Sequence, residues 1–318
     1  MTFDLLGLLA AFAAGILAGA LPLLLRALGR RRGAGVSEAE GEARRERRRH
    51  TLRVAAVSVG VTLAVVAGAG YAVLRVMLRT TPMTGVGVDQ AVEQFRSGVG
   101  DASSADAPPA GPLGPPPDGV YTYRATGAWA TTAPLFGTER RELPPTVPAT
   151  LRTDGDGWTM TFQYFDKHRT SLRFRGVPGP TLEEPGGDTD GVRFGLAVHT
   201  TMTCTPAAVV RPVAPGTSWS QACRTVSTGV MSAAQDLPSA TTLVGVERLE
   251  VGGVPVDAWH VRRESMVGGS QTGALRRDTW YSTKDGLLLR LETDSRTSGL
   301  ADHVEAIRLE LESLSPRR

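Results

Sequence analysis

Side chains that could bind a metal or act as nucleophiles are few and scattered in this 318-residue chain. Zinc sites and metal-dependent catalytic sites are commonly recognised by close spacings such as HExxH and CxxC. None of the histidines has such a spacing; they are His50, His168, His199, His260 and His303. The sequence therefore predicts no catalytic residue, no metal site and no cofactor.

Two short polar stretches resemble parts of functional loops. Gly268–Gly273 reads Gly-Gly-Ser-Gln-Thr-Gly and loosely resembles a hydrolase nucleophile elbow, but its second glycine is misplaced and no strand-to-helix turn is expected there. Asp188 and Asp190 resemble the start of a calcium loop that lacks the later bidentate glutamate. We interpret the first stretch as a hairpin loop and assign no metal to the second. An envelope hydrolase remains the enzymatic alternative.

The only two cysteines, Cys204 and Cys223, fall near the ends of neighbouring candidate strands. A lone pair is typical of a structural disulfide in an oxidising compartment. A bridge closing a loop of this size stabilises a fold by about 3 kcal/mol. The alternative is a pair of free buried thiols.

Most of the chain after residue 119 alternates between apolar and polar residues, which predicts antiparallel strands with one dry face. The alternation and the tryptophans predict a core or an apolar pocket, and the sequence leaves open whether the dry side is packed or hollow. Its candidate residues are Trp158, Met160, Phe162, Tyr164, Leu172, Phe174, Trp259 and Trp280.

The predicted fold is mainly β: two N-terminal transmembrane helices, a short helix, and one curved antiparallel sheet or half-barrel of roughly ten strands in a meander. Turns are expected at 166–167, at Gly252–Gly253 and at Thr283–Gly286. The candidate strands are Val120–Ala128, Trp158–Tyr164, Leu172–Phe174, Val192–Cys204, Thr217–Val226, Thr241–Val251, Val254–Glu264, Ala274–Ser282, Leu287–Asp294 and Ile307–Glu312.

Two uncharged apolar stretches near the N-terminus are long enough to cross a bilayer as helices. They predict a first transmembrane helix at 1–25 and a second at 54–78, separated by a basic loop at 26–53. The loop's arginines predict that it is cytoplasmic and that both termini are extracytoplasmic. These arginines include Arg30, Arg31, Arg32, Arg44, Arg45, Arg47, Arg48 and Arg49.

Alternatives to this topology stay open. The second span contains Ala67-Gly68-Ala69, a small-residue pattern at which a signal peptide could be cleaved, and a later start near Val36 would leave one span. The arginine cluster is also compatible with a patch for nucleic acid or anionic lipid. We favour a topology determinant that touches lipid headgroups.

The remainder of the chain is expected to comprise a short amphipathic helix within 79–97, a Pro/Gly/Ala-rich linker at 98–118 and an extracytoplasmic β-rich domain at 119–315. Residues 81–318 hold 23 of the 35 basic and 27 of the 32 acidic residues, a net charge of −4. No nucleic-acid partner is therefore expected for this part, although the whole chain has a net charge of +3.

Three stretches, Val88–Arg96, Gly119–Tyr123 and Arg277–Arg290, resemble uncharacterised actinobacterial membrane-anchored proteins with a β-rich extracytoplasmic domain. The last stretch also resembles a strand–turn–strand unit of periplasmic lipoprotein-carrier folds, in which a curved antiparallel sheet cradles lipid. This resemblance implies a fold and transfers no functional residue.

These observations favour a non-enzymatic binding protein of the cell envelope, held in the plasma membrane, whose ligand is a hydrophobic, lipid-like molecule or a protein partner. The alternative is a signalling or assembly component that uses the arginine-rich loop. Deleting residues 34–48 separates the two, because a carrier tolerates the deletion and a relay does not.

Overall fold

The structure is a computed structural model of the chain. It describes residues 82–98 and 113–318, except 135, 156, 178, 179, 230 and 231, together with the single positions 57, 60, 64, 65 and 68. The chain divides into two units, Met1–Tyr71 and Ala72–Arg318. All the elements named below belong to the second unit.

The expected spans at 1–25 and 54–78 and the basic loop at 26–53 lie outside the described residues, apart from five single helical positions in the second span. Of the expected linker, only Gly98 and 113–118 are described. Within the described part of the chain, no helix combines the length and the apolar character needed to cross a membrane.

One helix, α3 (Val88–Ser97), precedes a run of strands in the second unit. The strands are β1 (Gly119–Ala133), β2 (Gly137–Glu142), β3 (Thr146–Asp154), β4 (Gly157–Phe165), β5 (His168–Val177), β6 (Thr181–Arg193), β7 (Leu196–Thr205), β8 (Ala208–Val210), β9 (Ser218–Gly229), β10 (Ala233–Val251), β11 (Val254–Gly269), β12 (Gln271–Ser282), β13 (Leu288–Gly299) and β14 (Asp302–Leu311).

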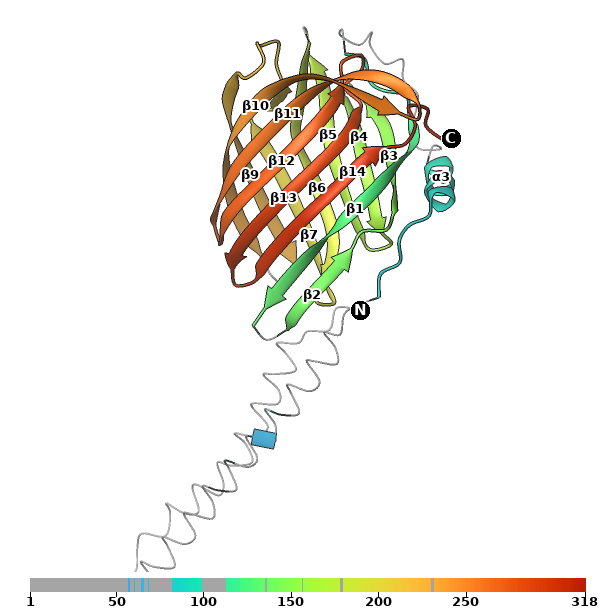
Figure 1. Cartoon of the computed structure of the whole chain (residues 1–318). Coiled ribbons are helices and arrows are strands. Elements are labelled where there is room, and N and C mark those ends of the chain that lie inside the picture. Colours follow the sequence, from blue (N-terminus) through green and yellow to red (C-terminus); the bar gives the residue numbers. More distant parts are fainter. Residues whose placement is uncertain are drawn as a thin grey trace, which may run out of the picture. The chain divides into compact units, whose positions relative to one another are not determined.

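The sheet is a closed antiparallel barrel of twelve strands (Figure 1). Neighbours in the sequence pair with each other around the ring, and β14 returns to pair with β1 through ten residue pairs, from Tyr123 with Leu311 to Thr132 with Asp302. Beside this ring, β2 extends the pairing of β1 and β8 pairs with β6. The expected meander is present, but the expected half-barrel is wrong. Closure pairs the edges that an open sheet would expose.

The strand count of roughly ten was also too low. The stretch 192–204, expected as one strand, contains a turn at Phe194 and Gly195, where φ is +51° and +78°, so it forms the end of β6 and nearly all of β7. The strands β2 and β3 were not anticipated, since charged residues and prolines obscure their alternation.

The three expected turns are all present. Gly252 and Gly253 join β10 to β11 with φ values of +58° and +80°, the left-handed geometry that a tight two-residue hairpin requires at both positions. The β4–β5 turn falls at 166–167, and Thr283–Gly286 lies in the turn between β12 and β13.

The barrel has two ends with different interiors. Six connections lie at one end of the barrel, which we call the hairpin end: β1–β2, β4–β5, β6–β7, β9–β10, β11–β12 and β13–β14. We call the opposite end, where the β10–β11 turn lies, the packed end. Large apolar side chains fill the packed end: Trp158 stacks on Phe174, with ring centroids 5.8 Å apart, and Phe174 meets Tyr281 edge-on at 6.0 Å. This half of the barrel is a packed core.

Helix α3 packs on the outside of the barrel wall near β1 and β3 (Figure 1). Its buried residues Ala91, Val92 and Phe95 follow helical spacing and contact Val120, which faces outward from β1. The guanidinium of Arg152 on β3 lies over the Phe95 ring at 4.6 Å and donates to the Phe95 carbonyl oxygen. The helix thus covers an apolar patch on the wall and leaves the lumen to the strands.

Candidate functional site

A cavity of about 200 Å³ occupies the lumen towards the hairpin end. We call it the lumen cavity. Its lining combines apolar and polar side chains. The apolar ones are Trp129, Phe162, Tyr164, Leu172, Leu291 and Ile307, and the polar ones are His168, Thr170, Thr189, Arg193, Thr200, Arg277, Thr293, His303 and Glu305. Several of the apolar residues, such as Leu172 and Leu291, also belong to the packed core. Polar groups lie directly beside the apolar ones, since Trp129 is opposite Glu305 in the register of β1 and β14.

Strand alternation explains why these residues meet. Inward-facing residues are two apart on each strand, so His303 and Glu305 on β14 share a face with Ile307. Arg277 on β12 likewise shares a face with Tyr281, and Arg193 ends the inner row of β6. Residues distant in sequence therefore converge because the sheet closes on itself.

A buried ion cluster lies beside the lumen cavity. The Glu184 carboxylate, with no exposed surface, accepts from Arg263 Nη2 at 3.2 Å and from Arg277 Nη1 at 3.5 Å. Arg263 Nη1 also donates to Gln221 Oε1 at 3.2 Å. One buried carboxylate therefore serves two guanidinium groups, which leaves the cluster with an excess positive charge.

The predicted disulfide between Cys204 and Cys223 is present and joins β7 to β9. Both cysteines face inward, and Arg263 Nη1 lies 3.7 Å from Cys223 Sγ and 3.9 Å from Cys204 Sγ. The bridge fixes the wall against which the guanidinium of Arg263 packs.

Glu305 is the acidic group of the lumen cavity. Its carboxylate lies 3.7 Å from His303 Nε2, and His303 Nδ1 is 3.0 Å from the Thr131 hydroxyl. Burial raises the pKa of Glu305, but the adjacent His303 ring and the nearby charges of Arg277 and Arg193 outweigh it, so the pKa lies below its ordinary value. Glu305 is therefore ionised at neutral pH.

Arg193 differs from the other lumen arginines. Within the described part of the chain it takes part in no hydrogen bond or ion pair, although its side chain lines the cavity. Burial lowers its pKa, and the charges of Glu305 and Glu139 only partly oppose this effect. An arginine guanidinium nevertheless stays protonated in proteins. Arg193 is thus a half-buried cation without a direct counter-ion.

Two further titratable groups on the cavity wall are held neutral by burial. Burial, together with the charge of Arg193, lowers the pKa of His168 to about 4, and the His168 ring lies 4.6 Å from that of Trp129. Burial also raises the pKa of the Tyr164 hydroxyl well above its usual value. Neither group changes charge near neutral pH.

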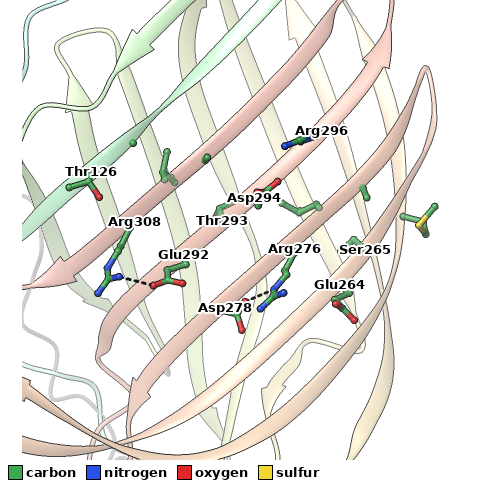
Figure 2. A pocket seen from close by; sticks show the side chains of 16 residues that line it. Thr126, Glu264, Ser265, Arg276, Asp278, Glu292, Thr293, Asp294, Arg296 and Arg308 are labelled. Atoms are coloured by element: carbon green, nitrogen blue, oxygen red, sulfur yellow. Dashed lines mark hydrogen bonds and ion pairs between the residues drawn. The ribbon is translucent and has the colours of Figure 1, made fainter.

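A second concave surface lies on the outside of the barrel across β1 and β11–β14, with a volume of about 740 Å³. We call it the outer groove. Figure 2 shows two of its ion pairs: Arg276 with Asp278 along β12 at 2.8 Å, and Arg308 on β14 with Glu292 on β13 at 3.4 Å. The exposed pair of Arg308 and Glu292 contributes about 0–1 kcal/mol. Asp278 is buried and also accepts from Arg262. The groove combines these charged side chains with apolar surface, to which Met266 and Ala274 contribute.

The structure separates the residues that were expected to form a core or pocket. Trp158, Met160 and Phe174 fill the packed end, and Trp259 packs half-buried against it. Phe162, Tyr164 and Leu172 also line the lumen cavity. Trp280 stacks on His260 at 4.2 Å and donates to Glu247, on the opposite face of β12 from Tyr281.

The polar residues of the lumen cavity were missed by the sequence analysis. A signal did exist: the inward phase of Ile307 and Leu309, extended backwards, reaches Glu305 and His303. A charged residue at an inward-facing position of an alternating strand indicates a polar lumen. In the described residues no group of histidine, cysteine, aspartate and glutamate side chains is arranged to hold a metal.

Comparison with protein families and with curated proteins gives no match. Among solved structures, the chain is similar to the hypothetical lipoprotein YmcC of Escherichia coli, with 12% identity over 71% of this chain and 97% of that one and a TM-score of 0.36. It is also similar to a putative lipoprotein of Parabacteroides distasonis, with 11% identity over 65% and 99% of the two chains and a TM-score of 0.31. At these TM-scores the likeness assigns no activity.

Proposed function

We propose that this chain is a membrane-anchored, extracytoplasmic binding protein of the cell envelope, and that its closed barrel binds a small amphipathic ligand in the lumen cavity. The observation that carries the proposal is the cavity itself, which is lined by both apolar and polar side chains inside an otherwise packed barrel. Binding sites of proteins typically combine an apolar lining with a few placed polar groups.

The anchoring and the compartment rest on the sequence. The two apolar stretches predict spans, and the arginines between them predict a cytoplasmic loop. The disulfide between Cys204 and Cys223 agrees with an oxidising compartment on the other side of the membrane.

The proposal is for binding rather than catalysis. A general acid or base works best when its pKa lies near the working pH. His168, with a pKa of about 4, and Tyr164, whose pKa is raised, are both shifted away from neutrality by burial. Turnover of generic ester or peptide substrates by the purified protein would contradict this part of the proposal.

The size of the cavity limits the ligand. Pockets for drug-sized molecules measure roughly 300–1,000 Å³, and the lumen cavity, at about 200 Å³, is smaller. It therefore accommodates a small molecule or one end of a longer one.

Native mass spectrometry of the full-length chain in detergent, purified from an oxidising host, tests the proposal. We expect a bound small molecule, identified after organic extraction, that is lost when Thr200→Phe fills the cavity. Thr200 lines the cavity, whereas its neighbour Thr201 faces outward, so Thr201→Phe is the matched control. A ligand retained equally by both variants would place binding outside the lumen.

A second candidate is an assembly or signalling role through the outer groove, favoured by that groove's size and charge. Photo-crosslinking from Asp294, inside the groove, would then capture a protein partner in cells, whereas crosslinking from Arg173 on β5 would not. Equal yields from both positions would remove this candidate.

A further inference from the structure

The charges that surround the lumen cavity do not balance. Three guanidinium groups, those of Arg193, Arg263 and Arg277, face two carboxylates, those of Glu184 and Glu305. The neighbouring Arg141 and Glu139 form their own pair at 2.5 Å and add no net charge. The three guanidinium groups therefore outnumber the two carboxylates by one, and His168 is neutral.

This surplus is concentrated at the cavity surface. Arg193 has neither a hydrogen bond nor an ion pair among the described residues, and Arg277 leaves its buried Nε without an acceptor. Arg277 reaches Glu184 only at 3.5 Å, because Arg263 shares that carboxylate at 3.2 Å. Buried donors such as Arg277 Nε are normally paired, and the half-buried Arg193 has no counter-ion, so the two side chains are incompletely satisfied without a further anion.

We infer that the lumen cavity recognises an acidic group, a carboxylate or a phosphate, which Arg193 and Arg277 hold while an apolar part of the same molecule lies against Trp129 and Ile307. The inference rests on the proposed binding function and names its ligand class. Guanidinium groups match both acids in geometry and charge.

The surroundings select an anion that has an apolar part. Trp129, Phe162 and Leu172 offer the rest of the ligand an apolar surface, so a fully hydrated inorganic anion gains little there. Glu305 keeps 27% of its side-chain surface open towards the cavity and repels a second negative charge, which favours a ligand with one acidic group.

Calorimetric titration of the full-length chain in detergent with three probes tests the inference. Hexanoate and hexyl phosphate carry an acid on a short apolar chain, and hexanol carries the chain alone. We expect both acids to bind at least about tenfold more tightly than hexanol. Hydrogen bonds to charged groups contribute enough binding free energy to change the affinity by that factor. Palmitate identifies the source of the acid: tight binding of palmitate indicates a lipid, and binding of hexanoate alone indicates a small free acid.

The variant Arg193→Gln removes the unpaired cation. We expect it to lose the preference for acids over hexanol and to melt at the same or a higher temperature, because no partner is left behind. The control Arg173→Gln, on the outer face of β5, should change neither property. Hexanol binding as tightly as the acids to the unmodified protein would overturn the acid inference and leave the binding function standing. Failure of all four probes to bind would overturn both.

Discussion

Glu184 is the residue on which the interior charges depend. Its carboxylate is fully buried and is shared by Arg263 and Arg277. Removing one partner from a buried ion cluster lowers the stability of the fold by far more than the intact cluster contributes to it, since the remaining charges stay desolvated. The adjacent Glu183 points to the outer face, where it pairs with Arg175 in partial contact with solvent.

The variant Glu184→Gln should therefore lower the free energy of unfolding by about 3–5 kcal/mol. Glu183→Gln, one residue away on the opposite face, should lower it by no more than about 1 kcal/mol. Urea denaturation at neutral pH measures both. Equal stabilities for the two variants would mean that the interior charges do not depend on Glu184.

His168 predicts a pH dependence of stability. Burial and the charge of Arg193, with smaller contributions from His303 and Arg141, lower its pKa to about 4 against the opposing charge of Glu305. Between about pH 6.5 and pH 4 the unfolded chain binds a proton at His168 that the folded protein does not, so stability falls as the pH falls through this window. The loss should reach roughly 1–3 kcal/mol, at about 1.4 kcal/mol per pKa unit.

The comparison of unfolding free energies for the unmodified protein and His168→Phe between pH 4 and pH 7 isolates this contribution. Phenylalanine preserves a ring beside Trp129 but does not titrate. The difference between the two proteins should change steadily across the window. A constant difference would show that His168 is protonated as easily in the folded protein as in the unfolded chain.

At the scale of elements, the disulfide restrains two strands that the ladder already pairs. Cys204 and Cys223 are directly opposite each other in the register of β7 and β9, and the closed loop has a sequence separation of 19. Replacing both cysteines by alanine should lower stability by about 3 kcal/mol through the unfolded chain while leaving the strand content of the circular dichroism spectrum unchanged. The variant should also be insensitive to reductant. A reductant effect on its unfolding would show a source other than the disulfide.

The seam between β1 and β14 depends on a glycine. Gly127 has a φ of +103°, and a Cβ at this position would lie 2.1 Å from the carbonyl oxygen of Ala306 on β14. Gly127→Ala should therefore lower the free energy of unfolding by more than the roughly 1–3 kcal/mol typical of an overpacked side chain, since backbone atoms must move. Gly245→Ala is the control, because a Cβ there meets nothing within 4 Å. Thermal melts compare the two, and equal melting temperatures would contradict the role of the seam.

The sequence predicted strands well where the two faces differ in polarity. From Trp158 to Tyr164 the apolar and polar residues alternate without exception, and β4 covers that stretch. From Thr189 to Arg193 the inner face is itself polar because it faces the cavity, so the contrast disappears and the end of β6 was misplaced. The alternation that located the core was therefore weakest where the candidate site lies.

Barrel closure had no local signal. It depends on pairing between Tyr123 and Leu311, at opposite ends of the domain, and no feature of either strand indicates its partner. The surplus charge of the lumen was equally hidden, because it appears only when Arg193, Arg277 and Glu305 are brought together by closure. Local patterns thus predicted elements, and the site required the topology.

At the scale of the whole barrel, the lumen is layered along its axis. Large rings such as Trp158 and Tyr281 fill the packed end, the charges of Glu184 and Arg263 form a middle layer, and the cavity follows towards the hairpin end. The layers differ in stability: burial of apolar side chains stabilises the packed end, whereas the layer at the lumen cavity is incompletely filled and lacks part of those contacts. Local stability should follow the same order along each strand that passes through all three.

Strand β13 offers a direct test by native-state hydrogen exchange, because it runs through every layer. Amides of Leu288–Leu291, beside the packed core, should exchange more slowly than amides of Ser295–Gly299 near the hairpin end, since opening the former exposes more buried apolar surface. A ligand that fills the lumen cavity, such as hexanoate, should slow exchange chiefly in the second segment, where it replaces missing contacts. If the probe slowed both segments equally, the barrel would open only as one unit and the cavity would not be a separately stabilised layer. Protection confined to the hairpin-end half would instead show that the incompletely filled layer is the part of the barrel that responds to a ligand.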